Sequence, residues 1–178
     1  LIEKGRENVL LQSNQFDTTW NNVSTSVTSG QAGYDGTNDA WLLESVTSGS
    51  FRRIDQSSGN GSVVTNSIYA KAGNVNYIAS TATNGSSSDV AYFDLANGVV
   101  SSFTGTNVID AQITSVGNGW YRCSVVSAPN NAGYSLWFIS SSGGSSSING
   151  NNVYIQDAQQ EQGLAASPYI ETTTTTAQ

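Results

Sequence analysis

The sequence predicts an all-β protein built as an antiparallel two-sheet β-sandwich. About twelve short segments alternate between apolar and polar residues with a period of two, as strands that bury one side do. Turns rich in Gly, Asn and Ser separate these segments at regular spacing, and no segment sustains helical periodicity beyond two turns. Evenly spaced short strands of this kind are typical of sandwiches and barrels.

The first half of the chain contains five predicted strands. In chain order they are residues 7–13, 20–29, 40–46, 50–55 and 63–72. Residues 30–38 (GQAGYDGTN) have a turn composition with Tyr34 at the middle, so they are expected to form a loop. Residues 63–72 (VVTNSIYAKA) alternate most cleanly and predict a central strand.

The second half contains seven more predicted strands and two hairpins. In chain order the strands are residues 75–83, 90–95, 99–104, 111–116, 120–126, 134–140 and 152–161. The pairs Asn97–Gly98 and Asn118–Gly119 predict tight turns, because such turns need positive φ angles that Asn and Gly tolerate. The Ser-rich residues 84–89 and 141–150 are expected to be loops.

Residues 152–161 (NVYIQDAQQE) are the predicted closing strand. Strict alternation places Val153, Ile155 and Asp157 on one face, so Asp157 is expected to point inward. Residues 7–13 (ENVLLQS) are the expected neighbour of this strand, which would bring the two ends of the domain together.

Three motifs carry a family resemblance. They are N-x-L-L-x-S-x-x-F-D-x-x-W at residues 8–20, G-N-G-W-Y-R-C-S at 117–124 and Y-I-x-x-A-Q-x-E-x-G-x-x-x-x-x-Y-I at 154–170. They resemble a jelly-roll domain of bacteriophage tail and other virion proteins, which is similar in turn to carbohydrate-binding modules and to galactose-binding-like domains. The resemblance spans residues 8–172 and implies a jelly-roll topology. Gln156 and Gln160 stand where many relatives carry Trp and Leu, so a sugar contact by that Trp is not available here.

The expected domain organisation is simple. Residues 1–6 are a predicted N-terminal extension, residues 7–171 the jelly-roll sandwich, and residues 172–178 (TTTTTAQ) a Thr-rich linker or tail with nothing to bury. The domain is expected to belong to a larger, multidomain virion protein on the virion surface or outside the cell, and the sequence leaves open whether that protein is oligomeric.

Composition restricts the partners. The net charge is −7, the pI is about 4.2 and only six basic side chains are present, so the sequence lacks the footprint of a nucleic-acid-binding protein. No apolar run approaches the length of a membrane span, so no membrane insertion is expected. Polarity comes mainly from hydroxyls and amides, which suit neutral partners such as sugars and suit exposed strand faces equally well.

The residue inventory also restricts the chemistry. The chain has no His, which excludes Cys–His catalysis, the usual Ser–His triad and the common zinc sites. Cys123 is the single cysteine and alternates with Tyr121 and Val125, so it is expected to be buried. Trp120 follows a tight turn within the resembled motif, and we expect it to be a core residue as well.

Carbohydrate binding is the main functional hypothesis. A sugar ring stacks on an aromatic side chain, while amides and guanidinium groups bind its hydroxyls. The aromatic candidates are Trp137, Tyr77, Tyr92, Tyr134 and Tyr34, and the hydrogen-bonding candidates are Arg52, Arg53, Asn76 and Gln156. For every aromatic residue the alternative is a place in the core. Residues 134–140 are apolar on both faces, so Trp137 could line an exposed face or a second core layer.

A structural calcium ion is the second hypothesis. The resemblance implies an ion between the opening segment and the last strand, with Asp17 and Asp157 as its ligands. The alternative is an Asp157 compensated by hydrogen bonds. Asp35 and Asp39 offer a less favoured loop site.

Enzymatic and purely structural functions are the remaining alternatives. Glu44, Asp55, Asp94 and Glu161 could supply acid and base groups for a glycosidase or lyase, but no pair of them has a motif. The sequence therefore predicts a non-catalytic carbohydrate-binding module of a phage virion or tail protein, which attaches to polysaccharide or cell-surface glycan. The alternatives are a structural decoration domain of a virion or fibre, and an accessory domain of a polysaccharide-degrading enzyme.

Overall fold

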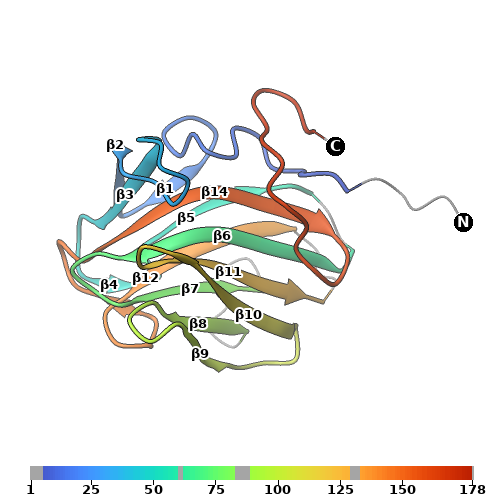
Figure 1. Cartoon of the computed structure of the whole chain (residues 1–178). Helices are drawn as coiled ribbons and strands as arrows, with labels where there is room; N and C mark the ends of the chain where they lie inside the picture. Colours follow the sequence, from blue (N-terminus) through green and yellow to red (C-terminus); the bar gives the residue numbers. More distant parts are fainter. Residues whose placement is uncertain (1–5, 60–61, 83–88, 129–132, 178) are drawn as a thin grey trace, which may run out of the picture.

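The computed structural model describes residues 6–59, 62–82, 89–128 and 133–177. Two six-stranded sheets face each other in a jelly-roll-like β-sandwich, and a two-stranded pair lies at one end (Figure 1). All strand pairings are antiparallel, and the described residues form no helix. The predicted fold class is confirmed.

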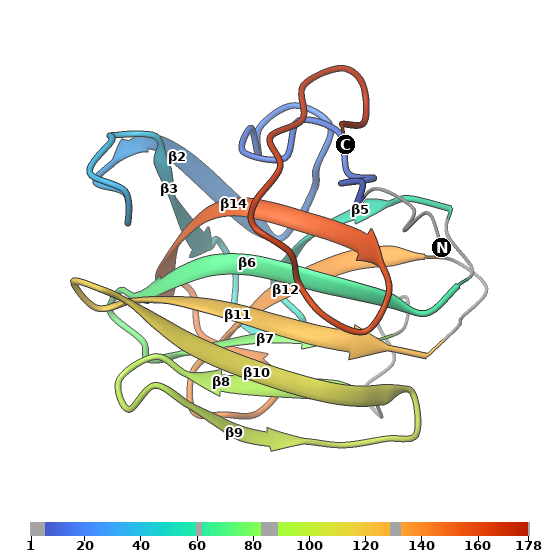
Figure 2. The same ribbon diagram turned by 45° about the vertical axis from the view of Figure 1, so that its right-hand side comes forward.

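The strands divide cleanly between the two sheets. The first sheet has the order β1 (Asn21–Val23), β5 (Arg53–Ser57), β12 (Tyr134–Ser140), β7 (Tyr77–Thr81), β8 (Val90–Asp94) and β9 (Val99–Phe103). The second sheet has the order β10 (Val108–Gly117), β11 (Trp120–Ser127), β6 (Val64–Ala72), β14 (Asn152–Gln162), β3 (Ala40–Ser45) and β2 (Thr25–Gln31). The short pair consists of β4 (Gly49–Ser50) and β13 (Ser146–Ser147). Figure 2 shows β14, β6, β11 and β10 in front of β12, β7, β8 and β9.

The predicted closing strand is β14, at the centre of the second sheet between β6 and β3. Its pairing with β6 has a bulge between Gln156 and Gln159, where Asp157 has a φ of 52°. A bulge inserts an unpaired residue and resets the alternation. Ala158 therefore joins Ile155 in the core, while Asp157 reaches the loop before β3 and bonds Tyr34. The prediction that Asp157 continues the inward face of Ile155 was wrong for this reason.

The N-terminal segment lies beside the end of β14 without forming a strand. The Val9 amide donates to the Gln160 carbonyl, and the Ala158 amide donates to the Ser13 carbonyl. The Asn8 side chain takes one place in this pattern, because its Oδ1 accepts the Gln160 amide at 3.1 Å. The prediction that residues 7–13 lie beside the closing strand is correct, but the Asn8 side chain replaces part of the regular backbone hydrogen-bond ladder.

The C-terminal segment packs along the N-terminal segment, and a bridge joins Asn8 to Ala177 (Figures 1 and 2). Thr172 is buried, and its hydroxyl donates to the Leu10 carbonyl at 2.6 Å. The Ser13 hydroxyl accepts the Thr172 amide at 2.9 Å. The Thr-rich segment therefore does bury a residue, contrary to expectation, because its hydroxyl and amide satisfy the polar groups of the opening segment.

The main core lies between the sheets, with a smaller cluster on the outside of each. The first sheet carries a cluster of Ala79, Val90, Leu136 and Phe138 on its outer face. The second sheet carries a cluster of Ala40, Tyr69 and Trp120. Cys123 and Trp120 are buried as predicted, and burial raises the pKa of the Cys123 thiol. These two outer clusters organise the candidate sites.

The two predicted hairpins are present, with different turns. Asn118 and Gly119 have φ angles of 53° and 78° and connect β10 to β11 as a two-residue turn, as predicted. Asp94 pairs with Val99 instead, so residues 95–98 connect β8 to β9, and positive φ occurs there only at Gly98. The Asp94 carboxylate explains the longer turn, because it accepts the Ala96 and Asn97 amides.

No helix long and apolar enough to span a membrane occurs among the described residues.

Candidate functional site

The structure distributes the predicted sugar-binding residues among the main core, the outer face of the first sheet, a loop and a turn away from that face, and the second sheet. Trp137 lies between the sheets with no exposed surface, and its ring centroid is 6.2 Å from that of Phe93. Because both faces of β12 are buried, this ring has no free surface on which a sugar could stack. Trp137 is therefore a core residue, and the sugar-stacking role assigned to it is corrected.

Four other candidates gather on the outer face of the first sheet, which we call the tyrosine face: Tyr77, Tyr92, Tyr134 and Arg53. The strand register explains this. Phe138 pairs with Arg53 on one side and with Ala79 on the other, and Ala79 pairs with Tyr92. Tyr77 and Tyr134 lie an even number of residues from Ala79 and Phe138 along their strands, so they share the same face.

The tyrosine face has an aromatic centre. Phe138 is fully buried there, and the half-buried rings of Phe51 and Tyr92 meet it edge-on, with centroids at 5.0 and 6.0 Å. Burial raises the pKa of the Tyr92 phenol, so this residue stays neutral and able to donate a hydrogen bond. The face thus combines apolar rings with neutral hydroxyls.

Polar groups of the tyrosine face are held by partners. The Tyr77 hydroxyl donates to Asp94 Oδ2 at 3.3 Å, and Arg53 Nε donates to Asp55 Oδ1 at 2.8 Å. The positive charge of Arg53 is therefore compensated, while its other guanidinium N–H groups donate to none of the described residues. This arrangement suits hydroxyl ligands better than a second carboxylate.

Arg52 and Asn76 lie away from this aromatic centre. The Arg52 guanidinium folds back on its own loop, where it donates to the Thr47 and Ser48 carbonyls. Asn76 is exposed in the turn before β7, and its backbone carbonyl accepts the Leu95 amide at 2.7 Å. The structure therefore gives Arg52 a role in shaping its loop and Asn76 a role in a turn.

The remaining candidates, Tyr34 and Gln156, lie on the second sheet. The Tyr34 ring stacks on Tyr69 with centroids 3.8 Å apart and planes 6° apart. Gln156 is fully buried: its Oε1 accepts the Tyr34 amide at 3.1 Å, and its Nε2 donates to Asp39 Oδ1 at 2.7 Å. Gln156 therefore holds the loop of residues 32–39 against the sheet, and its amide is not free for a sugar.

Asp157 completes this network. Its Oδ2 accepts the Tyr34 hydroxyl at 2.9 Å. Burial, followed by the charges of Asp39 and Asp35, raises the Asp157 pKa to about 7, against the opposing effect of the Tyr34 hydrogen bond. Burial and the neighbouring Asp157 in turn raise the pKa of Tyr34.

The two predicted calcium ligands have different surroundings. Asp17 is exposed in a turn, whereas Asp157 is buried and hydrogen-bonded. Within the described ranges, no group of three or more Cys, Asp or Glu is arranged to hold a metal ion. The calcium site stays a prediction.

The four carboxylates considered for acid–base chemistry each have their own partner. Asp55 pairs with Arg53, Glu161 pairs with Arg6 at 3.0 Å, Asp94 caps a turn, and Glu44 accepts the Asn152 amide at 3.4 Å. They lie on four different strands.

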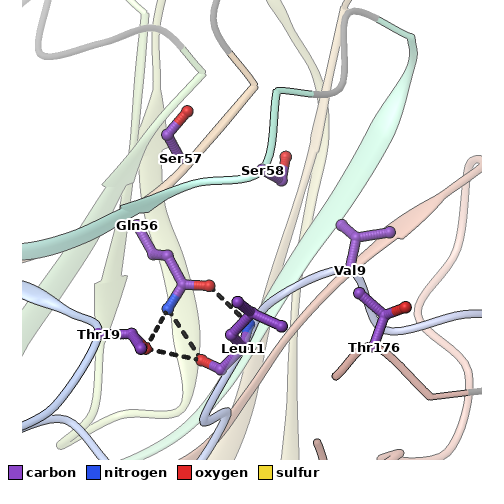
Figure 3. Close-up of a pocket in the computed structure, with 7 residues that line it drawn as sticks. All are labelled: Val9, Leu11, Thr19, Gln56, Ser57, Ser58 and Thr176. Atoms are coloured by element: carbon purple, nitrogen blue, oxygen red, sulfur yellow. Dashed lines mark hydrogen bonds between the residues drawn. The ribbon is translucent and has the colours of Figure 1, made fainter. Parts of the chain in front are cut away.

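A further pocket of about 400 Å³ lies where β5 meets the N-terminal segment (Figure 3). It is lined by Val9, Leu11, Thr19, Gln56, Ser57, Ser58 and Thr176. Figure 3 shows the Gln56 amide bonded to Leu11, whose amide donates to Gln56 Oε1 at 2.6 Å. The lining has no aromatic ring and no charge, so it offers no surface for stacking. The sequence held no signal for this pocket, because three distant segments form it.

Phe51 and Phe138 are the residues of the tyrosine face that were missed. The signal for Phe138 was present, since residues 134–140 are apolar on both faces. Phe51 carried no such signal, because it lies outside the strands at a φ of 53°.

The fold has likenesses among solved structures. The fold is similar to that of a chain from bacteriophage CBA120, the enzymatically active domain of tailspike protein 4, at 16% sequence identity and a TM-score of 0.47. The match covers 86% of this chain and 21% of the tailspike chain. No protein-family model matches the sequence, and no curated protein matches it.

The prediction that the chain is not an enzyme is contradicted by this comparison. The tailspike chain is named as an enzymatically active domain, so a match to it runs against that prediction, which is withdrawn.

Proposed function

We propose that this chain is a carbohydrate-binding domain of a phage tail protein, which uses the tyrosine face to contact polysaccharide or cell-surface glycan. The observation that carries the proposal is the row formed by Arg53, Phe138, Ala79 and Tyr92 across four neighbouring strands. This row places aromatic side chains on the outside of the sandwich. A domain with all its aromatic rings between the two sheets would have no aromatic surface there.

The geometry suits a neutral sugar. The half-buried rings of Phe51 and Tyr92 offer apolar surface for the C–H groups of a sugar ring. The hydroxyls of Tyr77 and Tyr92 and the guanidinium of Arg53 provide hydrogen bonds around that surface. The ion pair between Arg53 and Asp55 fixes the direction of the guanidinium before a ligand binds.

The phage context rests on the sequence motifs at residues 8–20, 117–124 and 154–170. A domain of this kind would be exposed on the virion and would attach it to a glycan. Single sites of this size bind weakly, and several copies on one particle raise the overall avidity.

The test is affinity electrophoresis of the 178-residue chain in gels that contain dextran, galactomannan or xylan. We expect retardation by at least one neutral polysaccharide, and a Tyr92→Ala substitution to weaken binding by at least about 5-fold. Release of reducing ends is measured in the same samples, so that binding and turnover are recorded separately.

Phe103→Ala is the matched control. Phe103 is 50% exposed on the neighbouring strand β9, but it pairs with Ala91, whose side chain lies in the main core. Its ring therefore extends from the opposite face of the first sheet. Equal binding by wild type and Tyr92→Ala, or equal loss in both variants, would show that the tyrosine face is not the sugar site.

A further inference from the structure

The second sheet carries positive charge that the protein does not neutralise. Five of the six basic side chains lie in the described ranges. Arg6 and Arg53 form ion pairs, and Arg52 donates to two carbonyls. The remaining two basic residues have no carboxylate partner among the described residues.

These two residues, Lys71 and Arg122, lie on the same outer face. Lys71 pairs with Trp120 on β11 and with Tyr154 on β14. Arg122 lies two residues after Trp120 on β11, so both side chains extend from the same face of the sheet. Its partner on β6 is Tyr69. Lys71 and Arg122 are thus diagonal neighbours on adjacent strands, a spacing of about 7–8 Å that long side chains can span.

Each cation lies among aromatic rings. The Arg122 guanidinium carbon is 5.4 Å from the centroid of the Tyr69 ring, whose ring also stacks against Tyr34. Arg122 Nη2 donates to the Ser67 hydroxyl at 3.1 Å, and the buried Nε has no hydrogen-bond partner. The guanidinium is therefore held in place by stacking while much of its hydrogen-bonding capacity remains unused.

Lys71 borders a hollow in the surface. A cavity of about 340 Å³ is lined by Gln31, Ala32, Lys71 and Tyr154. The aliphatic part of Lys71 runs past the β10–β11 turn, because a Cβ added at Gly119 would lie 3.5 Å from Lys71 Cε. Among the described residues no ion pair or hydrogen bond involves the Lys71 ammonium, so it is available to a ligand in this cavity.

The three carboxylates of the hydrogen-bond network around Tyr34 and Gln156 already have partners. Asp157 accepts the Tyr34 hydroxyl, while Asp35 and Asp39 accept the Thr37 hydroxyl and the Gln156 amide. None of them reaches Lys71 or Arg122 within ion-pair distance. An anionic ligand at the two cations therefore replaces no internal salt bridge.

We infer that Lys71, Arg122 and Tyr154 form a second site, the cationic patch, which binds an acidic sugar through its carboxylate. Charge-assisted hydrogen bonds from Lys71 and Arg122 bind the carboxylate, Tyr154 contacts the ring and Gln31 bonds a hydroxyl. This site lies on the opposite sheet from the tyrosine face and extends the proposed function to acidic polysaccharides. It does not depend on the tyrosine face, because the two share no residue.

The test compares polygalacturonate oligomers with their methyl-esterified form, which keeps the sugar and removes the charge. Calorimetric titration of the 178-residue chain is expected to show tighter binding of the acid form than of the ester form, because the ester can reach only the tyrosine face. The Lys71→Gln/Arg122→Gln double variant should bind the acid form at least about 10-fold more weakly, and Arg122→Lys should bind between the two. Arg52→Gln removes one positive charge elsewhere and should leave binding unchanged.

Several results would overturn the inference. They are equal binding of the acid and ester forms, no loss in the double variant while circular dichroism shows it folded, or an equal loss in Arg52→Gln. Equal binding of dextran sulfate or single-stranded DNA would indicate a general polyanion site rather than a sugar carboxylate site. Tyr92→Ala should leave the acid-specific binding intact, so the failure of one proposal is distinguishable from the failure of the other.

Discussion

The buried Asp157 makes the stability of this domain depend on pH in an unusual direction. Its pKa in the folded protein is about 7, against an ordinary value of 3.8. The folded state therefore binds more protons than the unfolded state between these two values, and the free energy of unfolding falls as pH rises through this interval. The stabilisation is fully present below pH 3.8 and is lost as pH rises through about 7.

The size of the effect follows from the interval. It spans about 3 pH units, and one unit corresponds to about 1.4 kcal/mol, so the loss is at most about 4 kcal/mol. Between pH 5 and pH 8 we expect a loss of roughly 2–3 kcal/mol, because part of the interval lies below pH 5. The pKa values of Asp35 and Asp94 are lowered by their hydrogen bonds, so these residues change stability only below pH 4.

The assay is urea unfolding followed by tryptophan fluorescence at pH 5, 6, 7 and 8, for wild type and Asp157→Asn. Asn tolerates the φ of 52° at this position, and its amide oxygen can still accept the Tyr34 hydroxyl. The wild type should lose stability relative to this variant as pH rises. Asp17→Asn, at an exposed carboxylate, is the control and should follow the wild type. The reasoning is refuted if the free energies of unfolding of the wild type and Asp157→Asn differ by the same amount at every pH from 5 to 8.

Three further substitutions test the packing. Asn8→Ala should lower the free energy of unfolding by about 2–4 kcal/mol in urea titrations, because the buried side-chain amide bonds four backbone groups, two on β14 and one in each terminal segment. Gly33→Ala should lower the melting temperature, since its Cβ would lie 2.5 Å from Gln156 Oε1, whereas Gly144→Ala meets nothing within 4 Å and should leave it unchanged. Trp137→Ala should cost about 3–5 kcal/mol in the same urea titrations, and a stability change below about 1 kcal/mol would contradict its place in the core.

Alternation within a strand predicted most of the sheet structure. A period of two needs no knowledge of neighbours, so β6, β12 and β14 were predicted within a residue or two of their observed bounds. The prediction from alternation failed where a bulge adds one residue to a strand. The bulge in β14 moves Asp157 off the face that alternation gave it, and nothing in the apolar pattern of residues 152–161 signals the extra residue.

The site residues were harder to predict, because the strand order decides which side chains from different strands lie together on one face of a sheet. Tyr92 and Arg53 share a row only because β12 and β7 lie between their strands. Trp137 illustrates the same limit. Both faces of its strand are apolar, and only the sheet order decides which face turns towards the other sheet and which towards the outside.

The distribution of basic residues between the two sheets gives their outer faces different chemistry. On the first sheet, Arg53 is bound to Asp55, so its charge is compensated and hydroxyl groups are the preferred partners. On the second sheet, Lys71 and Arg122 have no carboxylate partner within the described part of the chain, so an anion at the proposed site would gain charge-assisted hydrogen bonds. Salt screens exposed charges and leaves stacking largely unaffected, so raising the ionic strength weakens the cationic patch and spares the tyrosine face. If both proposed sites bind, the domain contacts neutral and acidic sugars on opposite sides, and one copy can bridge two segments of a mixed polysaccharide.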